Sequence, residues 1–309
     1  MDGKKISQLS RTLEIDIAVD LGGYTANSKM EIFSYRAAPI QVSYLGFLGT
    51  LSHDQIDYLI SDKIIIPEEL KKFYKEKIVY LPSYQVNDRK KEVPSNFFLR
   101  QELGISDDAF VFCNFNNNFK ITPKIFSLWM EILKETENSI LYLYADTPNV
   151  IINLQNEVVK KGIETNRIIF GGKLIQKEYL GRYLVCDLFL DTFPYNGGAT
   201  TSDALWAGLP VITLQGRSFA SRYGSSLLTA IGHPELITTN LQEYKNLAIR
   251  LAKNKNEIKK IQVSLKEKIL SSELFNSILF TKNLEKAYKH MYKNYHSGLS
   301  PTEIYIQED

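Results

Sequence analysis

The chain has little cysteine: Cys113 and Cys186 are the only two among 309 residues. Each stands in an apolar run, which favours buried thiols in a reducing compartment over a disulfide scaffold. No Cys-x-x-Cys pair and no cluster of cysteine and histidine offers metal ligands. These absences predict a cytoplasmic protein without a bound metal.

Long apolar runs and a strong charge of one sign are also missing. No stretch reaches the about 18 apolar residues that a membrane helix needs, and the first residues lack the apolar core of a signal peptide. The formal net charge of +2 is too small to indicate nucleic-acid binding. We therefore expect no membrane span and no nucleic-acid partner.

Three ligand motifs are absent as well. There is no G-x-x-x-x-G-K-[ST] and no clean G-x-G-x-x-G, so neither ATP nor NAD is indicated. There is no Asp-x-Asp that would hold a divalent metal against a diphosphate. No histidine stands in a catalytic cluster, and no Ser/His/Asp arrangement is visible.

What the sequence does contain is a strand–helix alternation after Gly104. Such alternation predicts a parallel sheet with right-handed crossovers, and ligands of these sheets lie beyond the carboxyl ends of the strands. Strands are predicted at 109–114, 139–144, 167–170, 188–190, 211–214 and 236–237, and helices at 123–135, 150–161, 177–184, 202–207, 219–231 and 241–253.

The part before Gly104 repeats this pattern less clearly. Short β-like runs at 15–21, 40–45, 57–61 and 78–81 are followed by a charged, unpatterned stretch at 86–95, which we interpret as a linker. Two Lys/Glu-rich helices at 256–270 and 276–295 and a polar tail close the chain. We therefore predict two lobes, 1–95 and 96–295, followed by a tail at 296–309.

The stretch from Leu188 to Pro210 combines a strand, a glycine turn, a helix start and the next strand. Small residues let backbone N–H groups approach an anion, and a helix N-terminus adds partial positive charge. The candidate anion loop is Asn196, Gly197, Gly198, Ala199, Thr200 and Thr201. The alternative is a tight connection without a ligand, in which Thr200 and Asp203 form a capping box.

Lys120 lies at the same predicted edge, between a strand end and the helix that begins near Pro123. A lysine at a helix N-terminus is electrostatically unfavourable, which favours a role in neutralising a diphosphate over a solvated lysine. Asn117 is a candidate hydrogen-bond donor beside it. Asp203 would suit ribose hydroxyls or a helix start equally well. Tyr179 and Arg182 lie near this edge, although a surface position is the ordinary expectation for the arginine.

These residues belong to longer segments that resemble a known family. The segments DLGGYT (20–25), RAAPIQVSYLGFLGT (36–50), CNFNNNFKITP (113–123), DLFLDTFPYNGGATTSDALWAGLPV (187–211) and GRSFASR (216–222) are similar to the catalytic region of the O-GlcNAc transferase and SPINDLY family, glycosyltransferase family 41. The likeness extends over nearly the whole chain, from Ile15 to about Tyr295.

The resemblance implies an α/β fold of the GT-B type, with two facing Rossmann-like lobes, and an enzyme that transfers a sugar to protein Ser or Thr hydroxyls with inversion and without a metal. The donor implied is UDP-GlcNAc, and the acceptor is a protein. Lys120 matches the lysine on the diphosphate, Asn117 the polar residue before it, and Gly198, Ala199 and Thr200 the loop around the phosphates. Asp203 matches the ribose-binding acid, Tyr179 and Arg182 residues near the base, and Leu45 and Gly46 a wall of the sugar pocket.

Several positions depart from the family pattern. Gly198-Ala199-Thr200 stands where O-GlcNAc enzymes usually carry His-Thr-Thr. The form found here is closer to that of SPINDLY-like members, some of which use GDP-fucose. Tyr179 replaces a histidine near the base, and Leu48 a proline. The family's first N-lobe βα segment and its tetratricopeptide repeats lie outside the sequence, so the resemblance implies a truncated N-terminal lobe. The alternatives are therefore an O-fucosyltransferase that uses GDP-fucose, or a truncated, non-catalytic module that binds a nucleotide or a partner. A separate chain that carries the repeats or completes the lobe is an expected partner.

Overall fold

The computed structural model describes residues 2–94 and 98–307, which form two compact units. The first unit combines the chain up to Val86 with the chain from Asn276 onward, and the second extends from Asn87 to Phe275. The lobe boundary predicted between residues 95 and 96 lies outside the described residues. The units also differ from the predicted lobes, because the last helix and the last strand return to the first unit.

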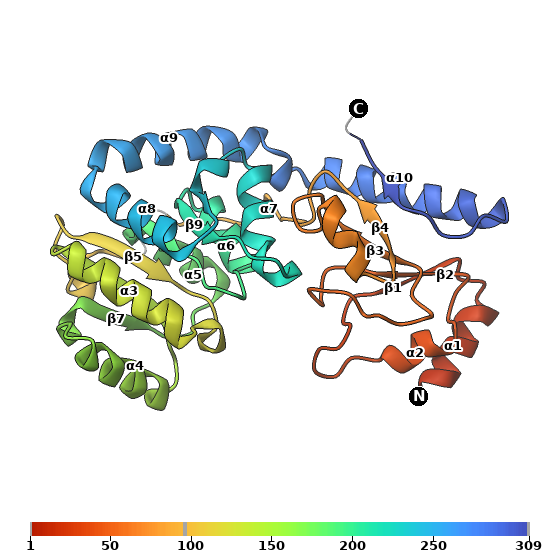
Figure 1. The fold of residues 1–309 in the computed structure, drawn as a ribbon, viewed down its shortest axis with the longest axis horizontal. Coiled ribbons are helices and arrows are strands. Elements are labelled where there is room, and N and C mark those ends of the chain that lie inside the picture. Colours follow the sequence, from red (N-terminus) through yellow and green to blue (C-terminus); the bar gives the residue numbers. More distant parts are fainter. Residues whose placement is uncertain (1, 95–97, 308–309) are drawn as a thin grey trace. The chain divides into compact units, whose positions relative to one another are not determined.

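The first unit is built on a sheet of five parallel strands in the order β1-β2-β3-β4-β11. Helices α1 and α2 pack together on one face of this sheet, and α10 lies along the other (Figure 1). The elements are α1 (Gly3–Thr12), β1 (Ile17–Asp20), α2 (Met30–Ser34), β2 (Ile40–Ser43), β3 (Tyr58–Ser61), β4 (Lys77–Tyr80), α10 (Ser277–His296) and β11 (Ile304–Tyr305).

The C-terminal part of this unit corrects the predicted second lobe and tail. Phe280 of α10 is buried, and its ring stacks on Tyr44 with the two centroids 6.2 Å apart. Ile304, in the predicted polar tail, is 1% exposed and pairs with Val79 of β4. Residues 276–307 therefore complete the core of the first unit.

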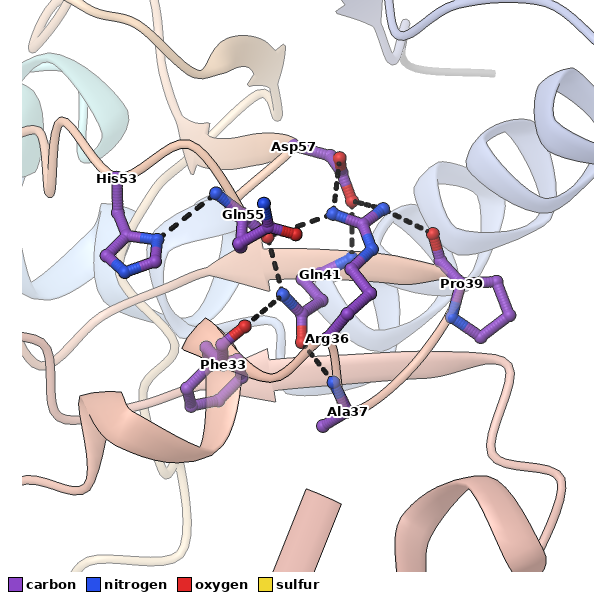
Figure 2. A network of polar contacts seen from close by, with 8 residues as sticks. All are labelled: Phe33, Arg36, Ala37, Pro39, Gln41, His53, Gln55 and Asp57. Carbon is purple, nitrogen blue, oxygen red and sulfur yellow. Dashed lines mark hydrogen bonds and ion pairs between the residues drawn. The ribbon is translucent and has the colours of Figure 1, made fainter. Parts of the chain in front are cut away.

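A polar network fixes the segment around Arg36 in the first unit (Figure 2). The Arg36 guanidinium donates to both carboxylate oxygens of Asp57, at 3.0 and 2.7 Å. The buried Gln41 side chain donates to Phe33 O at 3.0 Å and to Gln55 O at 2.5 Å. These contacts tie the end of α2 to the loop before β3, so several polar residues of the family-like segment 36–50 hold the backbone in place.

The second unit contains the predicted alternation of strands and helices around a six-stranded parallel sheet, in the order β10-β9-β8-β5-β6-β7. Helices α3 and α8 pack against each other, and α5 and α6 lie on the other side of the strands (Figure 1). The elements are β5 (Phe110–Asn114), α3 (Pro123–Glu135), β6 (Ser139–Tyr144), α4 (Pro148–Lys160), β7 (Ile168–Gly171), α5 (Gln176–Arg182), β8 (Leu188–Leu190), α6 (Ala199–Trp206), β9 (Val211–Leu214), α7 (Tyr223–Ala230), β10 (Ile237–Thr238), α8 (Leu241–Lys253) and α9 (Lys255–Ser271).

The apolar strands explain why this sheet forms. All residues of β5, β8 and β9 are buried, as expected for parallel strands covered on both faces. Helix α3 begins after Thr122, whose hydroxyl accepts the Ile125 N–H, and Pro123 occupies its first turn. Two predicted helices differ most: α6 begins at Ala199 instead of Ser202, and the helix predicted at 219–231 is a 3₁₀ turn followed by α7.

Candidate functional site

The order of the strands in the second unit defines where a ligand site is expected. From β5 the chain continues outward to β6 and β7, and then returns to add β8 on the other side of β5. The loops that follow β5 and β8 therefore diverge at a topological switch point, where ligands of open α/β sheets bind. Lys120 lies in the first of these loops and the Asn196–Thr201 segment follows the second strand.

The Lys120 side chain extends to the loop after β8. Its Nζ donates to Asn196 O at 2.9 Å and lies 4.1 Å from the centre of the Tyr195 ring. Burial lowers the pKa of Lys120, and the nearby Asp191 carboxylate opposes that shift. The lysine and the candidate anion loop therefore meet on one side of the sheet, as the sequence predicted.

Asp191, which the sequence analysis missed, is the buried centre of this loop. Its carboxylate accepts the N–H groups of Gly197 at 2.7 Å and Thr192 at 2.8 Å, and the hydroxyl of Thr213 at 2.8 Å. Burial raises the pKa of Asp191 to about 6, while these hydrogen bonds and Lys120 act against the rise. The sequence feature that could have revealed Asp191 is its position directly after the buried strand at 188–190.

The loop reaches α6 through two glycines that accept no side chain. A Cβ at Gly197 would lie 2.3 Å from Thr201 Oγ1, and one at Gly198 would lie 2.5 Å from the Tyr223 ring. The first hydrogen bond within α6 joins Ser202 N to Gly198 O at 2.9 Å. The N–H groups of residues 199–201 therefore precede the intrahelical ladder, and unpaired N–H groups at a helix start are the kind of donors that bind anions.

The predicted capping box of Thr200 and Asp203 is wrong. Gly198 is the N-cap residue, and the Thr200 hydroxyl instead donates to Asn116 Oδ1. Asn116 is buried and also donates to Thr192 Oγ1 at 3.0 Å, so the loops after β5 and β8 are joined by side chains. Among the described residues, the buried Thr201 Oγ1 has no hydrogen-bond partner.

Asn117 occupies a more peripheral position than the sequence suggested. Its exposed side chain caps the 3₁₀ turn of Asn118–Lys120 and accepts the Phe119 N–H at 3.4 Å. The inward asparagine is Asn116. The run of three asparagines hid this difference, because their spacing alone does not tell which one enters the core.

Asp203 lies in the second turn of α6 and is already paired. Its Oδ1 lies 2.6 Å from Lys91 Nζ, and the two side chains are 14% and 18% exposed. Burial raises the pKa of Asp203, and the ion pair with Lys91 opposes the rise. Lys91 lies in the segment 86–95 that was predicted to be a linker, and no role was predicted for it.

Helix α5 contributes Tyr179 and Arg182 in different ways. The Tyr179 hydroxyl hydrogen-bonds the Tyr183 hydroxyl, which in turn donates to Thr200 O at 3.1 Å. Arg182 is not a surface residue: it is 1% exposed, donates to Gly172 O at 2.5 Å and lies 5.1 Å from the centre of the Phe115 ring. Tyr179 is therefore linked to the Asn196–Thr201 loop through Tyr183. Arg182 instead contacts buried parts of the second unit, at Gly172 and Phe115.

Leu45 and Gly46 belong to the first unit. Leu45 adopts a positive φ of 69°, two residues after the end of β2. A Cβ at Gly46 would lie 1.8 Å from Leu21 O, so the glycine lets two backbone segments touch. Their predicted role as a sugar wall stays a prediction.

Neither a metal cluster nor a membrane helix is found in the described part of the chain. Across residues 2–94 and 98–307, no group of three His, Cys, Asp or Glu side chains is placed to hold a metal ion. Within the same ranges no helix has the length and apolar character to cross a membrane. Cys113 and Cys186 are both free and buried.

Comparison of the chain with known proteins identifies its relatives. The probable UDP-N-acetylglucosamine–peptide N-acetylglucosaminyltransferase SEC of Arabidopsis thaliana is 35% identical over 317 residues, covering 100% of this chain and 32% of that protein. The corresponding probable enzyme SPINDLY of Petunia hybrida is 32% identical over 307 residues, covering 98% and 33%. This chain therefore spans about a third of the length of these curated relatives.

A solved structure agrees with the sequence relatives. A mutant of the O-GlcNAc transferase of Thermobaculum terrenum superposes with a TM-score of 0.89 at 28% identity, covering 96% of this chain and 57% of that one. The predicted α/β fold of the GT-B type, with two Rossmann-like lobes, is thereby confirmed. The model of glycosyl transferase family 41 matches residues 2–95 and 84–284, and the chain belongs to that family.

Proposed function

We propose that this chain carries the donor-binding and catalytic part of a protein O-glycosyltransferase that moves N-acetylglucosamine from UDP-GlcNAc to Ser or Thr hydroxyls. The relatives named above are described as peptide N-acetylglucosaminyltransferases with a UDP-sugar donor, which supports this reaction. The observation that carries the proposal is the 2.9 Å contact of Lys120 Nζ with Asn196 O, because it puts a cation beside the N-terminus of α6.

The proposed chemistry follows from that placement. The acceptor hydroxyl oxygen forms a bond to the anomeric carbon as the bond from that carbon to the β-phosphate oxygen breaks, with inversion, and the hydroxyl proton is released to water. Negative charge then develops on the departing UDP. Lys120 and the N–H groups of residues 199–201 would stabilise that charge, as preorganised donors and helix N-termini do elsewhere.

The remaining predicted residues receive narrower roles in this proposal. Asn196 holds the shape of the loop through its backbone, and Asp203 binds the ribose hydroxyls. Tyr179 lies beside the nucleotide base, and Arg182 supports this part of the site from beneath. Asn117 lies at the rim of the donor site. Leu45 and Gly46 would form part of the sugar pocket. The same proposal includes a protein acceptor, a partner chain that carries repeats or completes the first lobe, and a cytoplasmic location, which two buried free cysteines support.

Titration calorimetry with UDP and GDP, followed by a transfer assay, tests the proposal. We expect UDP to bind more tightly than GDP, and labelled GlcNAc to pass from UDP-GlcNAc to a protein acceptor. Preference for GDP would indicate a GDP-fucose donor instead. Binding of UDP without any transfer would support a nucleotide-binding module, and binding of neither nucleotide would refute the proposal.

A further inference from the structure

The segment from Asn87 to Pro94, which the sequence analysis treated as linker, is fastened to the second unit. It contains no helix or strand. Asn87 bonds the Ser202 hydroxyl and donates to Leu274 O at 2.7 Å, and the Trp206 indole N–H donates to Lys91 O at 2.9 Å. Two of these anchors, Ser202 and Trp206, stand on α6 on either side of Asp203 in the sequence.

Within this segment Lys91 makes the contact of interest. Its ammonium lies 2.6 Å from Asp203 Oδ1, and both side chains are largely shielded from water. The neighbouring pair of Glu92 with Lys177 is different, because those side chains are 77% and 59% exposed at a separation of 3.1 Å. Exposed pairs contribute little, whereas a partly desolvated ion pair with good geometry is held more firmly.

The pair and the ribose of a nucleotide require the same carboxylate. Two neighbouring ribose hydroxyls engage both oxygens of an acid, and Lys91 already holds one of them. A neutral hydroxyl is a weaker partner for a carboxylate than an ammonium is. Because the Lys91 carbonyl is held separately by Trp206, the flexible side chain can leave Asp203 while the backbone stays in place.

We propose that Lys91 competes with the ribose of the donor for Asp203 and thereby sets the affinity of the site for nucleotides. This inference rests on the proposed function, since it requires Asp203 to bind ribose. Lys91 then acts as a latch on the donor site: its release accompanies nucleotide binding, and a chain without the ammonium binds nucleotide without that cost.

Calorimetric titration of UDP into the full chain and three variants tests the latch. Lys91→Met removes the ammonium and keeps the length of the side chain, and we expect it to lower the Kd for UDP by about three- to tenfold, as when the competent fraction of a two-state site rises. Asp203→Asn should weaken binding. In the double variant the gain from Lys91→Met should vanish, because no carboxylate remains to be released.

Lys177→Met is the matched control. It breaks the exposed pair with Glu92 on the same segment but does not touch Asp203, so the Kd for UDP should stay within about twofold of wild type. Far-ultraviolet circular dichroism of each variant checks the fold. An unchanged or higher Kd for Lys91→Met would overturn the latch. Failure of both wild type and Lys91→Met to bind UDP or GDP would instead refute the proposed function, and the latch with it.

Discussion

Two charged residues of opposite sign, the half-buried Lys120 and the buried Asp191, define the candidate site at the scale of single residues. Burial lowers the pKa of the lysine and raises that of the aspartate, and in both cases the other residue counteracts the shift. Each therefore helps to keep the other charged. A diphosphate arriving beside Lys120 would add negative charge and strengthen the protonated form of the lysine.

Replacing Lys120 tests its proposed catalytic role. Lys120→Ala should lower kcat/KM for UDP-GlcNAc by about 30- to 1,000-fold, equivalent to about 2–4 kcal/mol, since it removes a cation that stabilises the leaving group. Steady-state transfer assays measure this. Lys124→Ala is the control, because Lys124 is exposed in the first turn of α3. A wild-type rate for Lys120→Ala would contradict the assignment.

Asp191 gives a prediction for stability against pH. Its pKa rises from 3.8 to about 6 in the folded chain. Between these values the folded chain binds a proton more tightly than the unfolded chain, so the contribution of this group falls as pH increases from about 4 to about 6, by about 3 kcal/mol. Asp191→Asn should lack that fall.

Urea unfolding at pH 4, 5, 6 and 7 compares the two chains. The difference in unfolding free energy, variant minus wild type, should increase across this interval, because only wild type has to ionise the buried acid. Contributions from other titrating groups cancel in that difference. Parallel profiles would mean that the Asp191 carboxyl titrates as it does in the unfolded chain.

At the scale of elements, the sequence predicted helices and strands better than their ends. The predicted bounds of α3 and α8 are those observed, because Thr122 and Pro123 begin α3 and Asn240 begins α8 through local hydrogen bonds. The start of α6 was missed by three residues. It depends on the packing of Gly198 against Tyr223, which lies far along the chain and leaves no local signal.

The same limit applies to the site. The sequence predicted that Lys120 and the Asn196–Thr201 loop share one edge, because both follow neighbouring parallel strands. It did not predict the buried contacts of Asn116 and Asp191, or the pair of Lys91 with Asp203, since these depend on side-chain packing between segments about 75 to 112 residues apart.

The glycine turn before α6 yields a prediction at this scale. Gly197→Ala would put a Cβ 2.3 Å from Thr201 Oγ1 and 2.7 Å from Thr200 Oγ1, and the helix start would have to shift. We expect a loss of about 1–3 kcal/mol in unfolding free energy together with weaker UDP binding. Thermal unfolding and UDP titration measure both.

Gly172→Ala provides the matched control, because no atom lies within 4 Å of a Cβ built there. It should leave the unfolding free energy within about 0.5 kcal/mol of wild type. If Gly197→Ala behaved like this control, the close packing of the turn would not constrain the site.

At the scale of the whole molecule, the two units are assembled differently. The second unit is one continuous segment, whereas the first takes its sheet from both ends of the chain. Sequence patterns found α10 but could not tell which unit it joins, because an amphipathic helix fits any apolar face. Strand β11 has two residues, which is too short for an alternating pattern to reveal.

Substitution in β11 tests how much the C-terminal strand contributes to the stability of the first unit. Ile304 is 1% exposed and pairs with Val79, and the adjacent Tyr305 ring stacks on Tyr80 at 4.9 Å. Ile304→Ala should cost about 2–4 kcal/mol of unfolding free energy, since it removes buried methyl groups and leaves a cavity. The loss should fall on the first unit, so UDP binding at a temperature where the chain is folded should stay near wild type.

Scanning calorimetry with and without UDP separates the two units in this experiment. UDP raises the unfolding temperature only of the unit that binds it, whereas Ile304→Ala should lower the temperature only of the other. Ile278→Ala, on an α10 side chain that is 65% exposed, should change neither. A variant in which Ile304→Ala abolished the UDP-induced shift would mean that the donor site depends on the C-terminal strand, and that nucleotide binding is not a property of the second unit alone.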